Sequence, residues 1–392
     1  MTLKPAVFDH DPRTRLIVGP DSVDQVGRLA RALGGRNVLL VTDPHIEQVG
    51  HAERVRQFLE SEDSHVVTFD QVVENPTTEE VDRCAEVAHS ANVDLIVGVG
   101  GGSSLDTAKG CNFIYTNGGR MSDYWGVGKA TKPMLPFIAI PTTAGTGSEC
   151  QSFSLIADPV THQKMACGDP KAAARVAVLD PTLTLTQPRP VAAVTGIDAI
   201  AHAVETAVTT KRNAWSLLFS REAFCLSSLN LKRVLEEGND LYARGAMQLG
   251  AAYSGIAIEN SMLGAAHSAA NPLTARFGVV HGQAVGIMLP HVMRHNCKDA
   301  ATEQAYVRLA QLAGLAPPEA TAQYAVDAII MHLKELLYMA QIPDHLEAFG
   351  IESSDVDALA VEASEQWTAQ FNPRSVSVKE FTAFYRAALS AD

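Results

Sequence analysis

The sequence predicts an α/β domain with a parallel sheet, followed by an all-helical domain. In about the first 180 residues, short β-branched runs alternate with helical patterns, which is typical of a parallel sheet covered by helices on both faces. From about residue 190 onward the chain is rich in Ala and Leu, has few strand signals, and is broken by Gly or Pro near residues 238, 272, 316 and 343. We therefore expect two domains, residues 1–185 and 186–392, with the boundary in the proline-rich segment 181–190.

Each predicted strand of the first domain is a short apolar run. These runs are residues 37–42, 65–69, 94–99 and 137–141. Residues 22–35 have helical spacing and end at two glycines. Residues 77–91 are also helical, and Thr77 and Glu80 have the spacing of a capping box. In a sheet built this way, ligands bind at the carboxyl ends of the strands.

Length and composition exclude several classes of protein. The chain has 392 residues, enough for two domains with sizeable cores. No apolar run reaches the roughly 18 to 20 residues of a membrane helix, and residues 1–15 lack the pattern of a secretory signal. Six scattered cysteines without a CxxC pair favour reduced thiols, and the formal net charge of −13 argues against nucleic acid. We expect a cytoplasmic protein with no membrane or nucleic-acid partner.

A glycine-rich turn, "GGGSSLDTAKG" at residues 100–110, follows the run 94–99. Glycine permits close approach of the backbone, and the N–H groups at a helix start bind anionic oxygens, so the turn is a candidate phosphate site. Taken alone, such a turn is as often a plain connection. Asp43, directly after the run 37–42, can accept hydrogen bonds from ribose hydroxyls and repel a 2′-phosphate, which favours NAD over NADP; the alternative is a turn residue before Pro44.

The order of these features is not that of the standard dinucleotide fingerprint. There the acidic residue comes about 20 residues after the glycines, whereas Asp43 precedes them. A second loop, "PTTAGTGSE" at residues 141–149, is rich in hydroxyls and glycines and also follows a strand. It suits a phosphate or a ribose, although a single loop of this composition is more often only a connection.

The helical half contains a candidate metal site. Asp198 and His202 are four residues apart, so a helix places both on one face. With His267 and His281 they form a set of one carboxylate and three imidazoles that suits Zn, Fe(II), Co or Ni. A single histidine is more often a satisfied core or surface residue. These three, however, lie in Gly/Ala-rich apolar surroundings, where an unpaired polar ring is costly.

The combination of motifs resembles the iron-containing (group III) alcohol dehydrogenase family. The stretches that carry the resemblance span nearly the whole chain in order and spacing: "GGGSSLDTAKG", "PTTAGTGSE", "GIDAIAHAVE" and "HSAANPLTARFGVVHGQAVGIMLPHVMRHN". The resemblance implies a dehydroquinate synthase-like architecture, with an N-terminal dinucleotide-binding domain, a C-terminal helical domain and an active site in the cleft between them. It also implies a homodimer, NAD as the cofactor, and a divalent metal, with Fe(II) first and Zn as the alternative.

The resemblance also assigns individual residues. Those that match the family's metal ligands are Asp198, His202, His267 and His281. Asp43 matches the acidic residue at the adenosine ribose. The pyrophosphate loop and the further cofactor contacts correspond to Gly101, Gly102, Ser103, Asp106, Asn75, Thr142, Thr146 and Lys164.

Two positions depart from the family's pattern. Many relatives have a second histidine four residues after the third metal ligand, where this chain has Asn271. An amide can hydrogen-bond a substrate but cannot titrate as imidazole does, so we expect the proton to leave by a ribose hydroxyl and water. Ile258 replaces an aromatic residue of many relatives, and with Gln151 and Phe153 it is a candidate for lining the substrate pocket.

The expected activity is hydride transfer between NAD(H) and a small alcohol, aldehyde or ketone, by a metal-dependent alcohol dehydrogenase. Two other enzymes remain as alternatives: an NAD-using synthase of the dehydroquinate synthase type, and an enzyme like maleylacetate reductase. A third alternative is a nucleotide-sensing protein without activity. The physiological substrate, the direction of the reaction and the identity of the metal are open at this point.

Overall fold

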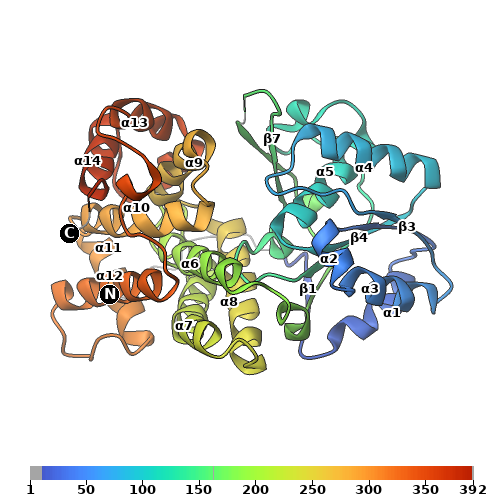
Figure 1. Cartoon of the computed structure of the whole chain (residues 1–392), viewed down its shortest axis with the longest axis horizontal. Helices are drawn as coiled ribbons and strands as arrows, with labels where there is room; N and C mark the ends of the chain where they lie inside the picture. The colour runs from blue at the N-terminus through green and yellow to red at the C-terminus, as the bar shows by residue number, and fades with distance from the viewer. Residues whose placement is uncertain (1–10, 162, 391–392) are drawn as a thin grey trace. The chain divides into compact units, whose positions relative to one another are not determined.

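The computed structural model describes residues 11–161 and 163–390. Within them the chain forms two compact units, Asp11–Gln187 and the part from Pro188 onward (Figure 1). The division lies inside the proline-rich segment, two residues after the expected end of the first domain at residue 185.

The first unit contains a six-stranded sheet in the order β1-β9-β6-β4-β2-β3. Every neighbouring pair is parallel, which confirms the predicted parallel sheet. The strands are β1 (Arg15–Val18), β2 (Asn37–Val41), β3 (His65–Phe69), β4 (Leu95–Gly100), β6 (Phe137–Pro141) and β9 (Val176–Leu179). Four of these are the strands read from the sequence. The other two, β1 and β9, have only four residues each, too few to show a period.

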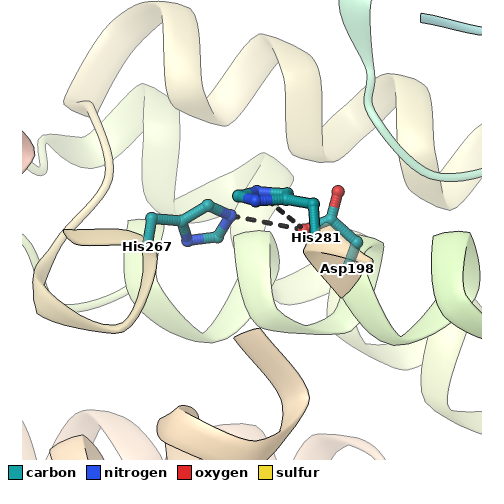
Figure 2. Close-up of side chains that lie close together, drawn as sticks. All are labelled: Asp198, His267 and His281. Carbon is teal, nitrogen blue, oxygen red and sulfur yellow. Dashed lines mark ion pairs between the residues drawn. The ribbon is translucent and has the colours of Figure 1, made fainter. Parts of the chain in front are cut away.

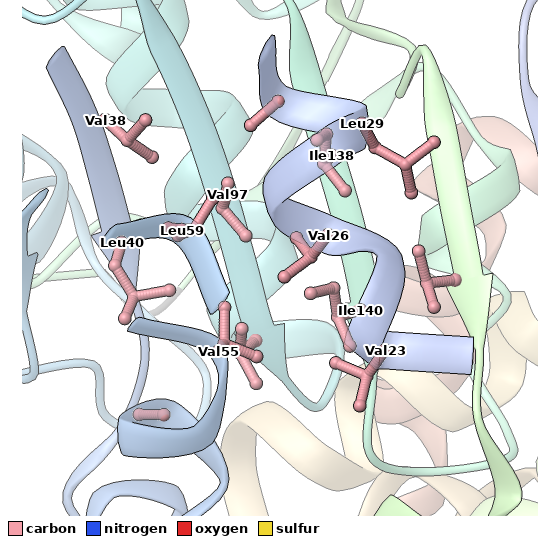
Figure 3. Packing of buried hydrophobic residues seen from close by; sticks show 14 of the residues in the cluster. Val23, Val26, Leu29, Val38, Leu40, Val55, Leu59, Val97, Ile138 and Ile140 are labelled. Atoms are coloured by element: carbon pink, nitrogen blue, oxygen red, sulfur yellow. The ribbon is translucent and has the colours of Figure 1, made fainter. Parts of the chain in front are cut away.

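Helices cover both faces of this sheet. They are α1 (Val26–Ala32), α2 (Pro44–Gln48), α3 (His51–Glu60), α4 (Thr78–Ala91) and α5 (Gly102–Asn117). Successive strand residues point to opposite faces, so Val38 and Leu40 share a core with α1 and α3 (Figure 3), whereas Leu39 and Val41 share one with α4 and α5. The predicted capping box of α4 is present: Thr77 N–H donates to Glu80 Oε2 at 2.8 Å.

A small second sheet, which the sequence did not predict, lies in the same unit. It is formed by β5 (Gly126–Val127), β7 (Phe153–Ala157) and β8 (Lys164–Gly168), in the order β5-β8-β7. The β7–β8 pair is antiparallel. Ala157, opposite Lys164 in this pair, donates its N–H to the carbonyl oxygen of Pro76, so the hairpin is joined to the segment that precedes α4.

The second unit is helical, and its described residues, 188–390, contain no β-strand. Its helices are α6 (Arg189–Thr206), α7 (Ala214–Glu236), α8 (Leu241–Ser261), α9 (Ala265–Phe277), α10 (His281–Asn296), α11 (Ala300–Leu312), α12 (Ala322–Met339), α13 (Val356–Glu365) and α14 (Val378–Ala388). The break expected near residue 272 is wrong, because α9 continues through Pro272. Proline removes one backbone hydrogen bond, and burial of the residues around it in α9 outweighs that loss.

Two observations bear on the class of protein. None of the described helices is long and apolar enough to cross a membrane. All six cysteines are free thiols, and four of them are buried.

A buried lysine fastens the loop after β6 to α5. Lys109 Nζ donates to the carbonyl oxygen and the hydroxyl of Ser148, both at 2.7 Å, and to the carbonyl oxygen of Phe153 at 2.8 Å. Asp106 lies 3.5 Å from the same ammonium group and accepts from the Ser148 hydroxyl. Next to Ser148, Glu149 is 2% exposed. Burial raises the pKa of Glu149 to about 7, against the opposing effects of its own backbone N–H and the charge of Lys109.

Replacing Glu149 with Gln is expected to stabilise the protein relative to the wild type at neutral and higher pH, and little at pH 5. The folded-state pKa of about 7 lies above the ordinary value of 4.5. As the pH rises from 4.5 to 7, the unfolded chain loses this proton first, so the free energy of unfolding falls, by on the order of 3 kcal/mol. Thermal midpoints followed by circular dichroism should therefore favour Glu149→Gln over the wild type more at pH 8 than at pH 5. The exposed Glu74→Gln is the control, and an equal difference for Glu149→Gln at both pH values would contradict the argument.

Candidate metal and cofactor sites

The candidate metal site is centred on one buried oxygen. Asp198 lies on α6, and its Oδ1 is approached by the Nε2 atoms of three imidazoles. The distances are 3.5 Å from His202, 3.3 Å from His267 and 3.9 Å from His281. Figure 2 shows Asp198, His267 and His281 with their side chains directed toward one another. Residues that lie up to 83 positions apart in the sequence thus meet at one point of the helical unit.

Three helices supply these side chains. His267 is the third residue of α9, and His281 is the first residue of α10. The next residue of α10, Gly282, allows that helix to approach α6 closely, because a methyl group at Gly282 would overlap the carbonyl oxygen of Val194. The dipeptide His281–Gly282 therefore combines a candidate ligand with the residue that permits its placement.

The donor set fits a divalent cation. Ligand atoms of Asp198, His267 and His281 all lie within 4.8 Å of one another. In a tetrahedral site with bonds of about 2.0 to 2.1 Å, neighbouring ligand atoms are roughly 3.3 Å apart. The distances from Asp198 Oδ1 to His267 and His202 match this value, and His281 lies somewhat farther away. Asp198 Oδ1 and His267 Nε2 are buried and have no hydrogen-bond partner among the described residues. Buried polar atoms are costly without a partner, and a bound cation would provide one for both.

His202, the fourth predicted ligand, lies beside this group. Its ring stacks on that of His267, with centroids 4.7 Å apart and planes inclined by 18°. Its Nε2 is 3.5 Å from Asp198 Oδ1. The group of described residues whose ligand atoms all lie within 4.8 Å of one another consists of Asp198, His267 and His281, without His202. The structure therefore brings three predicted ligands together and places His202 in contact with them.

The electrostatics favour positive charge at this point. Burial acts to raise the pKa of Asp198, but His202, His267 and His281 outweigh it and hold that pKa well below its usual range. Burial acts in the same way against the charged form of His267, but the carboxylates of Glu205 and Asp198 raise the pKa of His267 to about 9. Both shifts have the same physical origin, namely carboxylates enclosed among polar rings away from water.

Glu205 is a member of this site that the sequence analysis missed. Its Oε2 lies 2.6 Å from His267 Nδ1 and accepts the Gly264 N–H at 3.1 Å, while its Oε1 accepts the Ala266 N–H at 2.7 Å. The signal was present in the sequence. Glu205 follows Asp198 by seven residues and His202 by three, so all three lie on one face of α6.

Asn271 is held by a neighbouring segment. It lies one turn after His267 on α9 and is half-buried, and its Nδ2 donates to Gln366 Oε1 at 3.0 Å. The amide predicted to contact substrate is thus oriented by a second amide that the sequence did not associate with it.

In the α/β unit, the glycine turn opens α5 at the carboxyl end of β4. Gly100 has φ +148°, and a Cβ there would overlap the Ser104 hydroxyl. Gly101 is the N-cap of α5 and provides no side-chain cap. A Cβ on Gly102 would come within 2.8 Å of Thr146 Cγ2. The first N–H groups of a helix have no intrahelical partners, so this bare helix start is suited to an anion.

Asp43 lies beside that turn. It is the N-cap of α2, and its Oδ1 accepts the N–H groups of His45 and Ile46, both at 3.0 Å. Its Oδ2 accepts the Ser104 hydroxyl at 3.2 Å. Because β2 and β4 are neighbours, the acidic residue and the glycines meet at one edge of the sheet, although they are separated in the sequence.

The remaining predicted cofactor residues lie in two places. Thr146 packs against Gly102, whereas Thr142 is buried, with its N–H bonded to the carbonyl oxygen of Gly100. Lys164 pairs with Ala157 at one end of the β7–β8 hairpin, and the Ala157 N–H is bonded to the carbonyl oxygen of Pro76. Asn75, with φ +53°, directly precedes Pro76 and so lies next to this end of the hairpin.

Asp106 points into the protein rather than toward the helix start. Both of its carboxylate oxygens accept protein donors, the Ser148 hydroxyl at 2.5 Å and the Leu155 N–H at 3.1 Å. Of the three pocket candidates, Phe153 and Ile258 are buried. The third, Gln151, donates its amide to the carbonyl oxygen of Thr146.

Known protein families match both units. The model for "Iron-containing alcohol dehydrogenase" matches residues 12–181, and the model for "Fe-containing alcohol dehydrogenase family, C-terminal" matches residues 192–389. Alcohol dehydrogenase 4 of Schizosaccharomyces pombe is 34% identical over 95% of this chain and 87% of its own length. NAD-dependent methanol dehydrogenase of Bacillus methanolicus is 31% identical over 95% of this chain and 97% of its own.

A further relative and a solved structure agree with these matches. 1,3-Propanediol dehydrogenase of Citrobacter freundii is 32% identical over 97% of this chain and 99% of its own. The crystal structure of a 1,3-propanediol oxidoreductase superposes with a TM-score of 0.94 at 30% identity, covering 98% of this chain and all of that one. With the site geometry, these findings show that the chain belongs to the iron-containing alcohol dehydrogenase family and is a metal-dependent, NAD-linked alcohol dehydrogenase.

Proposed function

We propose that this enzyme oxidises small alcohols, or reduces the corresponding aldehydes and ketones, at one divalent cation held by Asp198, His202, His267 and His281. The observation that carries the proposal is the convergence of three imidazole Nε2 atoms on Asp198 Oδ1. Fe(II) is the proposed metal because the family is named for iron, and Zn is the alternative.

The chemistry divides between the bound groups and the protein. A divalent cation supplies a Lewis acid that lowers the pKa of an alcohol hydroxyl or polarises a carbonyl. NAD supplies the acceptor for the hydride. The protein excludes water on one side of the site and admits substrate on the other: Asp198 and His267 are almost fully buried, whereas the side chain of His281 is 29% exposed. We assign the His281 side as the approach for the substrate oxygen.

Asn271 has a positioning role in this proposal. Its amide, fixed by Gln366, can hydrogen-bond a polar group of the substrate but does not exchange a proton near neutral pH. The residue therefore contributes to substrate selection rather than to proton transfer.

The start of α5 is the proposed site for the pyrophosphate of NAD. The N–H groups of Gly102 and Ser103 are in the first turn of this 16-residue helix, and Thr146 packs against Gly102. Asp43 is proposed to accept the hydroxyls of the adenosine ribose. Its carboxylate accepts the hydroxyl of Ser104, the residue that directly follows Ser103. The proposed ribose and pyrophosphate sites therefore adjoin.

Relatives suggest the size of the substrate. Those at 31 to 32% identity include enzymes named for methanol and for 1,3-propanediol. We therefore propose short primary alcohols and diols as substrates. We further propose a cytoplasmic homodimer, without a nucleic-acid partner; the net charge of −13 supports the last point.

The alternative enzymes are not favoured. Curated relatives over most of the chain are named as alcohol, methanol and propanediol dehydrogenases rather than as synthases or maleylacetate reductases. Net NADH formation distinguishes a dehydrogenase from a synthase that uses NAD transiently. Metal analysis of the purified chain, combined with NAD reduction over short alcohols, diols and hydroxy acids, tests the whole proposal. A chain that binds NAD but reduces none of it with any alcohol would be the inactive nucleotide-binding protein instead.

Replacing His267 with Ala is expected to remove the metal and the activity together. Loss of an outer partner of a metal ligand typically costs about 10- to 100-fold, so loss of the ligand itself should lower turnover by more than about 100-fold. Metal content per chain and NADH formation are the two measurements. His345→Ala, a half-buried histidine paired with Asp344, is the control. A His267→Ala enzyme that lacks metal but turns over at the normal rate would refute the proposed site.

Replacing Asp43 with Asn is expected to relax the preference for NAD. Asn is as good an N-cap as Asp, so α2 should be retained, while the charge that repels a 2′-phosphate is lost. We expect the ratio of kcat/KM for NAD to that for NADP to fall about 10-fold, the equivalent of about 1.4 kcal/mol. Asp24→Asn, an exposed residue of the 3₁₀ turn Ser22–Gln25, is the control. An unchanged ratio would place the ribose elsewhere.

A further inference from the structure

The residue that carries a further inference is Glu205, which is 3% exposed near the end of α6. It is not one of the candidate ligands, since its closest contact in the site is the far nitrogen of a ligand ring. Oε2 lies 2.6 Å from His267 Nδ1, whereas the Nε2 of the same ring faces Asp198 at 3.3 Å. His267 is therefore held between two carboxylates, one on each side of the imidazole.

The same carboxylate holds the beginning of α9. The N-cap residue Gly264 has no side chain that could accept the first N–H groups of the helix. Glu205 takes this role from another helix by accepting the N–H groups of Gly264 and Ala266. A Cβ at Gly264 would come within 3.0 Å of Glu205 Oε1, so any larger residue there would crowd the carboxylate. Glu205 thus fixes the backbone on which His267 stands as well as its ring.

The contact also determines which ring nitrogen carries hydrogen. Both oxygens of Glu205 already accept backbone N–H groups, so we assign the Nδ1–H of His267 as the donor to Oε2. In a neutral imidazole Nε2 then bears the lone pair, which is the form that binds a metal. The orientation is consistent with this, because Nε2 is the ring nitrogen that faces Asp198 Oδ1.

We propose that Glu205 is a positioning residue for the metal centre, which selects the Nδ1-protonated form of His267 and aims its Nε2 at the cation. This inference rests on the proposed function, in which His267 is a metal ligand. A positioning role and a purely structural role for Glu205 lead to different expectations. If Glu205 positions His267, loss of its carboxylate should weaken metal binding more than an equal loss of stability at the start of α9 does.

The test is titration of the full, chelator-treated chain with Co²⁺, following its visible absorption. Glu205→Gln keeps the size of the side chain, but its amide cannot accept from His267 and from both backbone N–H groups as the carboxylate does. We expect the affinity for Co²⁺ to fall about 10- to 100-fold, with a changed absorption spectrum for the bound ion.

Ser268→Ala is the matched control. The Ser268 hydroxyl bonds to the carbonyl oxygen of Gly264 and to Thr368, so this variant weakens the same end of α9 without touching His267. Its thermal midpoint should fall while its Co²⁺ affinity and spectrum stay as in the wild type. Wild-type affinity and spectrum in Glu205→Gln would overturn the inference and leave Glu205 as a helix cap. Failure of the wild-type chain to bind Co²⁺ would instead overturn the proposed function, and the inference with it.

A measurement without substitution covers the case in which Glu205→Gln does not fold. In wild-type chain loaded with Zn²⁺ and labelled with ¹³C,¹⁵N-histidine, the ring of His267, assigned by through-bond correlation to its own backbone, should carry a proton on Nδ1. A proton on Nε2 of that histidine would overturn the inference.

Discussion

The buried carboxylate of Asp198 is the constraint on which the helical unit depends. An isolated charge at such a depth is expensive, and it persists only where opposite charge or strong polar contact surrounds it. Three imidazoles from α6, α9 and α10 provide that environment. The small residues near them serve the same purpose, because Gly282 lets α10 approach α6 and Gly264 lets Glu205 reach the start of α9. Packing and metal chemistry therefore impose the same requirement on these helices.

In the α/β unit the main constraint is different: the first N–H groups of α5 must be accessible to an anion, with no side chain in front of them. Glycines at the start of α5 leave that helix end open, and the threonine-rich loop after β6 lies over it. Lys109 holds this loop against α5 from inside the protein through Ser148 and Phe153. The residues of the motif thus have two roles. Gly101 and Gly102 form the accessible start of α5, whereas Asp106 and Lys109 are buried and hold the neighbouring loop against the helix.

The chain departs from the resemblance at a position that matters chemically. Asn271, one turn from His267, replaces a residue type that can titrate with one that cannot. Its hydrogen bond to Gln366 gives the amide a defined orientation, which suits recognition of a substrate group better than exchange of protons. The metal site itself does not depend on this residue, since the ligand distances involve only α6, His267 and His281.

The sequence by itself determined the parallel sheet, the helical second half and the identity of the candidate ligands. Those features have local signals: β-branched runs such as residues 37–42, the capping box at Thr77, and the four-residue spacing of Asp198 and His202. It could not reveal Lys109 as the support of a distant loop, nor that Pro272 is accommodated within α9. The contact between Glu205 and His267 joins residues 62 positions apart, so only tertiary packing decides which ring nitrogen faces which carboxylate. The spacing of residues in the sequence indicates which face of a helix a side chain occupies. Which side chain of another helix it contacts depends on how the helices pack.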